Sequence, residues 1–104
     1  MIYLVIIEKL TLEGKKNYNK VLEWQKKFDE WLMSHGATWK SAKHFITLIG
    51  KPAYETWLEY PNYSAMGEDE EKAKGFAQDP EWQELISKMN MYFKRINSRV
   101  VKEI

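Results

Sequence analysis

The sequence predicts an α+β fold in which one four-stranded antiparallel sheet is covered on a single face by helices. Three observations predict it. An apolar, β-branched segment opens the chain, a long amphipathic segment follows, and two alternating segments joined by a Gly/Pro turn come next. The chain has 104 residues, 44% of them apolar, so it can bury one core and is expected to form a single domain over residues 1–104.

The first strand is expected at Ile2–Ile7, where every residue is apolar. Such a run is typical of a central strand that is covered on both faces. A helix is expected from Gly14 to His35, because its apolar residues recur at helical spacing. Gly36 is expected to end this helix in the left-handed conformation. The apolar positions of the helix are Tyr18, Val21, Leu22, Trp24, Phe28, Trp31 and Leu32.

Two further strands are expected to pair as an antiparallel hairpin. Apolar and polar residues alternate over residues 38–49 and again over 53–60, and Gly50-Lys51-Pro52 between them supplies turn chemistry. The alternation places Ala42, His44 and Ile46 on one face of the hairpin, and Trp39, Phe45 and Trp57 on the other.

The C-terminal part of the chain predicts two helices and a last strand. Asn62 or Ser64 can cap a helix over residues 65–76, whose acidic run followed by lysines suits an exposed position. Asp79, followed by proline and glutamate, begins the second helix. The last strand is expected at residues 96–104. The apolar stripe of the second helix comprises Trp82, Leu85, Ile86, Met89 and Phe93.

The order of the elements is that of a ferredoxin-like, split β-α-β-β-α-β unit, in which the helices cover only one face of the sheet. The other face would then expose Trp39, Phe45 and Trp57 together with half of the first strand. An apolar patch of this size is unusual on a monomer. The sequence therefore predicts a homodimer in which two copies pack sheet face to sheet face.

Composition excludes several classes of partner. The formal net charge is +1 and the basic residues are not clustered, which provides no field for nucleic acid. No run of ~18 apolar residues is present, so no contact with a membrane through a spanning helix is expected. Cysteine is absent, which rules out disulfides and thiol chemistry and favours a cytoplasmic location.

At this point the chain resembles the dimeric α+β-barrel superfamily. The resemblance rests on the strand Tyr54–Tyr60, the acidic short helix after it, and the segment Asp79-Pro80-Glu81-Trp82. It is nearest to NIPSNAP-like proteins, and it extends to antibiotic-biosynthesis monooxygenases. The resemblance implies the fold and a dimer. The haem-degrading members use a helix histidine as iron ligand, and residues 65–93 contain none, which argues against haem degradation.

A binding chamber is expected between the sheet and its helices, or inside the barrel of the dimer. Five tryptophans are more than so small a core needs, and they could line a chamber for a flat, apolar or aromatic ligand. The alternative is that these aromatic residues build only the core and the dimer interface. The candidate ligand-binding residues are Trp57, Trp31, Trp24 and Tyr3.

His44 is the first candidate for a catalytic residue, since a partly buried strand histidine can act as a general base near neutral pH. Its expected partners are Tyr54 across the hairpin, or Glu55 or Glu59. The alternatives are a hydrogen-bonded core histidine and glutamates on the wet side of a strand. The candidate catalytic residues are thus His44, Tyr54 and Glu59. With two histidines and no cysteine, neither a metal site nor a cofactor is expected.

Three functions remain open from the sequence. The first is a NIPSNAP-like protein that binds a small apolar or aromatic molecule. The second is a cofactor-independent monooxygenase or isomerase acting on an aromatic substrate, in which the protein only binds and deprotonates it. The third is a structural module that assembles through its sheet. Binding of an aromatic ligand would separate the first two from the third, and loss of turnover alone in His44→Ala would separate the second from the first.

Overall fold

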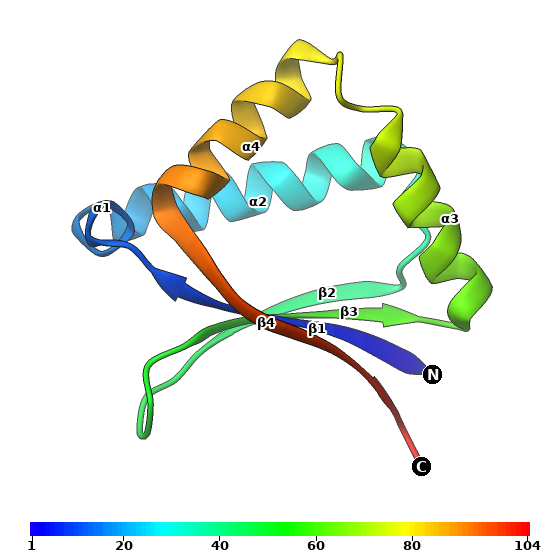
Figure 1. Cartoon of the computed structure of the whole chain (residues 1–104), viewed down its shortest axis with the longest axis horizontal. Helices are drawn as coiled ribbons and strands as arrows, with labels where there is room; N and C mark the ends of the chain where they lie inside the picture. The colour runs from blue at the N-terminus through cyan, green and yellow to red at the C-terminus, as the bar shows by residue number, and fades with distance from the viewer.

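The computed structural model describes all 104 residues and contains four strands and four helices (Figure 1). The elements follow one another in the predicted order, with one additional short helix near the N-terminus. The strands are β1 (Ile2–Leu10), β2 (Ser41–Ile46), β3 (Tyr54–Tyr60) and β4 (Phe93–Lys102), and the helices are α1 (Leu12–Lys16), α2 (Tyr18–Ser34), α3 (Tyr63–Lys74) and α4 (Pro80–Tyr92).

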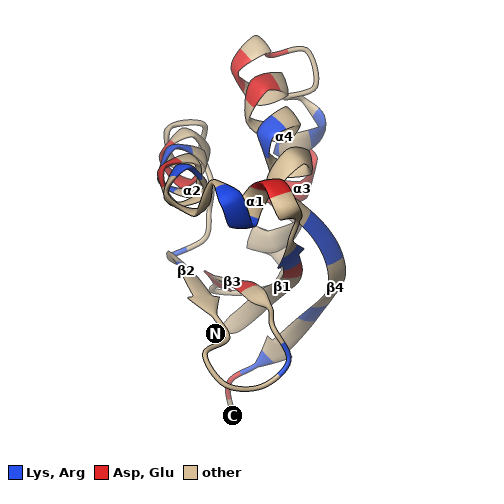
Figure 2. Cartoon of the chain, turned by 90° about the vertical axis from the view of Figure 1, so that its left-hand side faces the viewer, with Lys and Arg blue, Asp and Glu red and all other residues tan.

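The four strands form one antiparallel sheet in the order β2-β3-β1-β4. This confirms the predicted fold class and the central place of β1, which pairs with β3 on one side and β4 on the other. Helices α2 and α4 lie over the same face of the sheet, and no element covers the opposite face (Figures 1 and 2). None of the helices has the length and apolar character needed to cross a bilayer.

The expected helix from Gly14 to His35 is wrong in one respect, because the segment is broken at Asn17. Helix α1 begins after Thr11, whose hydroxyl accepts a hydrogen bond from the Gly14 amide at 3.1 Å. It ends where the Asn17 side chain donates to the carbonyl of Glu13 at 2.9 Å. A short polar side chain that bonds to nearby backbone favours such a break. The C-terminal signal is confirmed, since Gly36 has φ of 88°.

The hairpin strands are shorter than expected, and this changes the position of Trp39. Strand β2 begins only at Ser41, so the strand alternation does not extend to Trp39. Its predicted place on the uncovered face is wrong. The indole instead packs on the helix side, against a buried cluster at the N-terminal end of β1. That cluster comprises Ile2, Tyr60, Ala65 and Met66.

A second buried cluster occupies the other end of the covered face. It comprises Val21, Trp24, Tyr54, Tyr92 and Phe93, and Val21 is fully enclosed. Phe93 belongs to strand β4 and not to the helical stripe in which the sequence placed it. The two clusters fill the two ends of the space between the helices and the sheet. A cavity lies between the clusters, over the middle of the sheet.

Strand β4 contains an irregularity that changes which of its residues face the helices and which face the uncovered side of the sheet. Its register with β1 shifts between Ile7, which lies opposite Asn97, and Glu8, which lies opposite Arg95. Ile96 is therefore an extra residue, as in a β-bulge. Before the shift Phe93 and Arg95 share the helix-facing side with Glu8, whereas after it the odd-numbered residues, such as Val101, share the uncovered side with Tyr3.

Candidate functional site

A cavity of about 340 Å³ lies between the sheet and the helices that cover it. Its floor is formed by helix-facing residues of β1 and β3, and its roof by α2, α3 and α4. Most of the residues that line it are apolar, and a small number of polar groups are brought together among them. The lining includes Ile6, Glu8, Trp24, Phe28, Asp29, Trp39, Thr56, Leu58, Phe76, Trp82, Met89 and Arg95.

Aromatic rings form a continuous part of the roof. Phe28 of α2 stacks on Trp24 with ring centroids 5.0 Å apart and on Trp82 of α4 at 5.7 Å. Phe76, in the connection between α3 and α4, lies 5.2 Å from Trp82. The indole nitrogen of Trp24 donates to the carbonyl of Leu85 at 3.0 Å, which fixes the first ring against α4. A flat ring system would meet aromatic faces along this wall.

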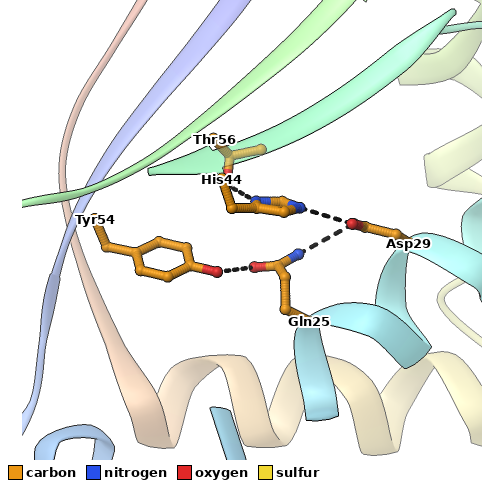
Figure 3. Close-up of polar contacts among 5 residues, drawn as sticks. All are labelled: Gln25, Asp29, His44, Tyr54 and Thr56. Carbon is orange, nitrogen blue, oxygen red and sulfur yellow. Dashed lines mark hydrogen bonds and ion pairs between the residues drawn. The ribbon is translucent and has the colours of Figure 1, made fainter. Parts of the chain in front are cut away.

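Five polar side chains form a connected network at one side of the cavity (Figure 3). His44 of β2 approaches Asp29 of α2 with 2.6 Å between Nε2 and Oδ2, and its Nδ1 lies 2.8 Å from the hydroxyl of Thr56. Gln25, one turn before Asp29 on α2, donates to Asp29 Oδ1 at 3.0 Å. The hydroxyl of Tyr54 donates to Gln25 Oε1 at 2.9 Å. The network joins the hairpin to the helix layer.

The proton positions in this network follow from the acceptors. A carboxylate only accepts, so Nε2 of His44 carries the hydrogen that is shared with Asp29. In the neutral ring Nδ1 then accepts from the Thr56 hydroxyl, and in the imidazolium it donates to it. Both ring nitrogens are engaged, and His44 does not itself line the cavity, whereas Asp29 and Thr56 do. Asp29 is therefore the member of the pair that borders the cavity.

Tyr54 anchors the network to strand β3 through its hydrogen bond to Gln25. Its side chain is buried, and burial, followed by the charge of Asp29, raises the pKa of its hydroxyl far above the ordinary value. The phenol therefore stays protonated and keeps donating to Gln25. Gln25 in turn donates an amide hydrogen to Asp29, so the Asp29 carboxylate is held by two donors from two different elements, Gln25 of α2 and His44 of β2.

Glu8 is a second acidic group at the cavity wall. It lies on the helix-facing side of β1, opposite Tyr54 in the β1–β3 register and opposite Arg95 in the β1–β4 register. Only 8% of the residue is exposed, and desolvation raises the pKa of its carboxyl, although the charges of Arg95 and His44 act in the opposite direction. No group of three or more His, Cys, Asp or Glu side chains that could hold a metal ion is present.

The structure separates the predicted site residues into three groups. His44 and Tyr54 belong to the polar network, and Trp24 lines the cavity. Trp31 is buried outside the cavity lining and stacks on His35, with ring centroids 3.7 Å apart. Tyr3, Trp57 and Glu59 lie together on the uncovered face of the sheet, away from this cavity.

The residues on the uncovered face form a cluster of their own. Tyr3 and Trp57 have ring centroids 5.7 Å apart, and Phe45 packs edge-on against Trp57 at 6.3 Å. The Tyr3 hydroxyl lies 3.0 Å from a carboxylate oxygen of Glu103 and 3.0 Å from one of Glu59, and these hydrogen bonds raise the pKa of Tyr3 to about 12. Phe45 remains 49% exposed, so this aromatic cluster is only partly covered within one chain.

Four polar residues of the cavity, Asp29, Thr56, Gln25 and Glu8, were not singled out from the sequence. The expected partner of His44 was Tyr54, Glu55 or Glu59, but the groups that bind it are Asp29 and Thr56. The signal for Asp29 and Gln25 was present, since both interrupt the apolar stripe of their helix between Val21 and Leu32. Glu8 gave a similar signal, because it lies on the same side of β1 as Ile2 and Ile6 and is the first charged residue there.

Comparisons with known proteins place the fold. No protein-family model matches the sequence, and no curated protein does. A NIPSNAP domain protein from Burkholderia xenovorans is 18% identical, with a TM-score of 0.66 over 100% of this chain and 95% of its own. A protein from Agrobacterium tumefaciens is 17% identical, with a TM-score of 0.68 over 100% and 94%. An antibiotic biosynthesis monooxygenase is 14% identical, with a TM-score of 0.59 over 97% and 94%.

These structures cover nearly the whole chain at low sequence identity, so what they share with it is the arrangement of sheet and helices. The shared arrangement is the antiparallel sheet with strand order β2-β3-β1-β4 and helices on one face. The chain therefore has the ferredoxin-like α+β fold of these structures, as its sequence predicts.

Proposed function

We propose that this protein binds a small, flat, largely apolar or aromatic molecule in the cavity between its sheet and its helices. The observation that carries the proposal is the cavity itself, about 340 Å³ in volume, with an aromatic roof and a few polar groups in its wall. Ligand sites are typically concave, mostly apolar and furnished with a few well-placed polar groups. The likeness to a NIPSNAP domain protein supports the fold on which this site is built.

Filling the cavity is expected to remove binding. In Ile86→Trp an indole would occupy space that Ile86 leaves open in the cavity wall, so the affinity for naphthalene should fall by roughly tenfold or more. Isothermal titration calorimetry measures this directly. Leu48→Trp is the matched control, since Leu48 lies in the hairpin turn and is 91% exposed. Equal affinity in the wild type and both variants would place the ligand elsewhere, and no binding to any of them would refute the proposal.

The Asp29–His44 pair favours a second candidate function, the deprotonation of the bound molecule. Asp29 faces the cavity while His44 and Gln25 hold its carboxylate. A proton from a ring hydroxyl or an acidic C–H would move to Asp29, and the bonding electron pair would stay on the substrate as an anion. Return of the proton at another carbon is an isomerisation, and reaction of the anion with dioxygen would begin a cofactor-independent oxygenation.

Substitution of Asp29 is expected to separate proton transfer from binding. In heavy water the wild type should accelerate exchange of the methyl protons of a bound acetylnaphthalene, and Asp29→Asn should reduce that acceleration by roughly a hundredfold or more. The asparagine keeps the size of the side chain but is a much weaker base. NMR spectroscopy measures the exchange, and calorimetry on the same samples measures binding. Exchange in the wild type no faster than in buffer would exclude this function and leave the binding proposal intact.

We further propose that two copies of the chain pack through the uncovered face of the sheet. Tyr3, Phe45 and Trp57 give this face an apolar, aromatic centre, and no helix of the same chain lies over it (Figure 2). A two-fold axis would place the same cluster of each copy against the other. The dimer would account for the aromatic content of a face that one chain leaves partly exposed.

A further inference from the structure

Glu8 is an acidic side chain without a protein partner at the wall of the cavity. It is 8% exposed, and it makes neither a hydrogen bond nor an ion pair within the chain. The only fully enclosed side-chain nitrogen or oxygen atom that lacks a partner is Nε1 of Trp31. The carboxyl atoms of Glu8 are therefore not sealed inside the protein, and the space that they reach is the cavity.

A buried polar group without a hydrogen-bond partner costs free energy. In a ligand site, the ligand can supply the missing partner. The groups nearest to Glu8 are Arg95 of β4, His44 of β2 and Tyr54 of β3, and Asp29 of α2 lines the same cavity. Arg95 is exposed and too far from Glu8 to form an ion pair. Burial raises the pKa of the Glu8 carboxyl above its ordinary value, in spite of Arg95 and His44.

A protonated carboxyl has one hydrogen to donate, whereas an ionised one only accepts. Asp29, whose carboxyl oxygens accept from His44 and Gln25, is the acceptor at the same cavity. The two acidic side chains thus present opposite hydrogen-bonding character to a molecule between them. A ligand that satisfies both carries an acceptor oxygen toward Glu8 and a hydroxyl toward Asp29.

We propose that Glu8 binds the ligand as a neutral acid that donates a hydrogen bond to a carbonyl oxygen, so that the ligand of this cavity is a planar aromatic carbonyl compound that also carries a hydroxyl group. The inference rests on the proposed binding function and specifies its ligand class. A site built to hydrogen-bond a group discriminates strongly against the analogue that lacks it, because its own polar group is then left unpaired. A carboxylate ligand would place a second negative charge beside Asp29 and is disfavoured.

Three proteins and two probes test the role of Glu8 as a donor. The probes are naphthalene and acetylnaphthalene, which differ in one carbonyl group, and the proteins are the wild type, Glu8→Gln and Glu8→Met. The wild type at a pH below the raised pKa of Glu8 should bind acetylnaphthalene roughly tenfold more tightly than naphthalene. Glu8→Gln keeps an N–H donor and should keep the preference, whereas Glu8→Met, of similar length and apolar, should lose it. Calorimetry measures all six affinities.

The pH dependence supplies the readout that a merely structural role would not produce. The preference of the wild type for acetylnaphthalene should disappear as the pH rises through the raised pKa of Glu8, since the ionised carboxylate cannot donate. In Glu8→Gln the preference should persist over the same range. Preference in the wild type that does not change with pH, or that survives in Glu8→Met, would overturn the inference.

Unfolding of the ligand-free protein tests the protonation state of Glu8 independently of any probe. Below the ordinary glutamate pKa of about 4.3 the carboxyl is protonated in both the folded and the unfolded chain. As the pH rises further, the unfolded chain loses its proton first, so the wild type should lose stability relative to Glu8→Gln until the folded-state pKa is passed. Parallel stability curves would overturn the inference.

The outcomes distinguish the two proposals. If neither probe binds the wild type, the proposed binding function fails and the role of Glu8 fails with it. If naphthalene and acetylnaphthalene bind with equal affinity to all three proteins, the cavity is a binding site and only the inference about Glu8 is overturned.

Discussion

Replacing Trp24 by alanine is expected to lower the free energy of unfolding by ~3–5 kcal/mol. Trp24 is 5% exposed and connects the helix layer to the sheet, since its ring stacks on Phe28 of the same helix and contacts Phe93 of β4. Its indole N–H also donates to the carbonyl of Leu85. Alanine would remove the packing and leave that carbonyl without its donor. Urea denaturation followed by circular dichroism measures the loss.

Two further variants divide the effect of Trp24 into its parts. Trp24→Phe keeps most of the ring packing and removes the hydrogen bond to Leu85, so it should cost less than the alanine variant, with ~1 kcal/mol assigned to the bond. Met33→Ala, at a position on the same helix that is 62% exposed, should change stability by no more than ~0.5 kcal/mol. A Trp24→Ala effect as small as that of Met33→Ala would mean that this core cluster does not stabilise the fold.

Introducing a charge at Trp57 is expected to convert the proposed dimer into monomers. Trp57 lies at the centre of the aromatic cluster on the uncovered face, between Tyr3 and Phe45. In Trp57→Glu the two-fold axis would bring two unpaired carboxylates into an apolar interface, and the dissociation constant should rise by roughly a hundredfold or more. Sedimentation velocity over a dilution series measures the change.

Met33→Glu is the matched control for this experiment. Met33 lies on α2, on the helix side of the molecule, so a glutamate there leaves the sheet face unchanged. It should have the same oligomeric state as the wild type. A monomeric wild type would refute the proposed dimer, and a dimer that tolerates Trp57→Glu would place the interface on another surface.

The order of the elements could be predicted because several local signals agreed. The apolar β1, the alternation of the hairpin and the Asp79–Pro80 helix start each indicated one element, and together they allowed few topologies. The break at Asn17 could not be predicted, because the apolar residues keep their helical spacing across it. The position of α1 depends on a tertiary contact, since Thr11 bonds to the backbone of the last residues of α4.

The candidate site was only partly accessible to sequence analysis. Histidine and tyrosine on a hairpin attract attention by residue type, and His44 and Tyr54 do belong to one network. Strand pairing, however, identifies only neighbours in the sheet such as Thr56, whereas Asp29, the carboxylate bound to His44, comes from the helix layer. Which turn of α2 lies above β2 is decided by packing of the whole layer. The position of Asp29 above His44 therefore follows from the three-dimensional structure alone.

The extra residue in β4 has a consequence for how the chain can vary in length. Counting outward from the C-terminus, every second residue of β4 faces the uncovered side as far as Asn97, and beyond Ile96 the count is reversed. Loss of that one residue would leave a regular ladder in which Arg95 stays opposite Glu8 and Phe93 stays opposite Leu10. A gap at this position in an aligned relative would thus keep both faces of β4 as they are, whereas a relative of the same length without the bulge would turn Arg95 and Phe93 away from the cavity and from the core cluster.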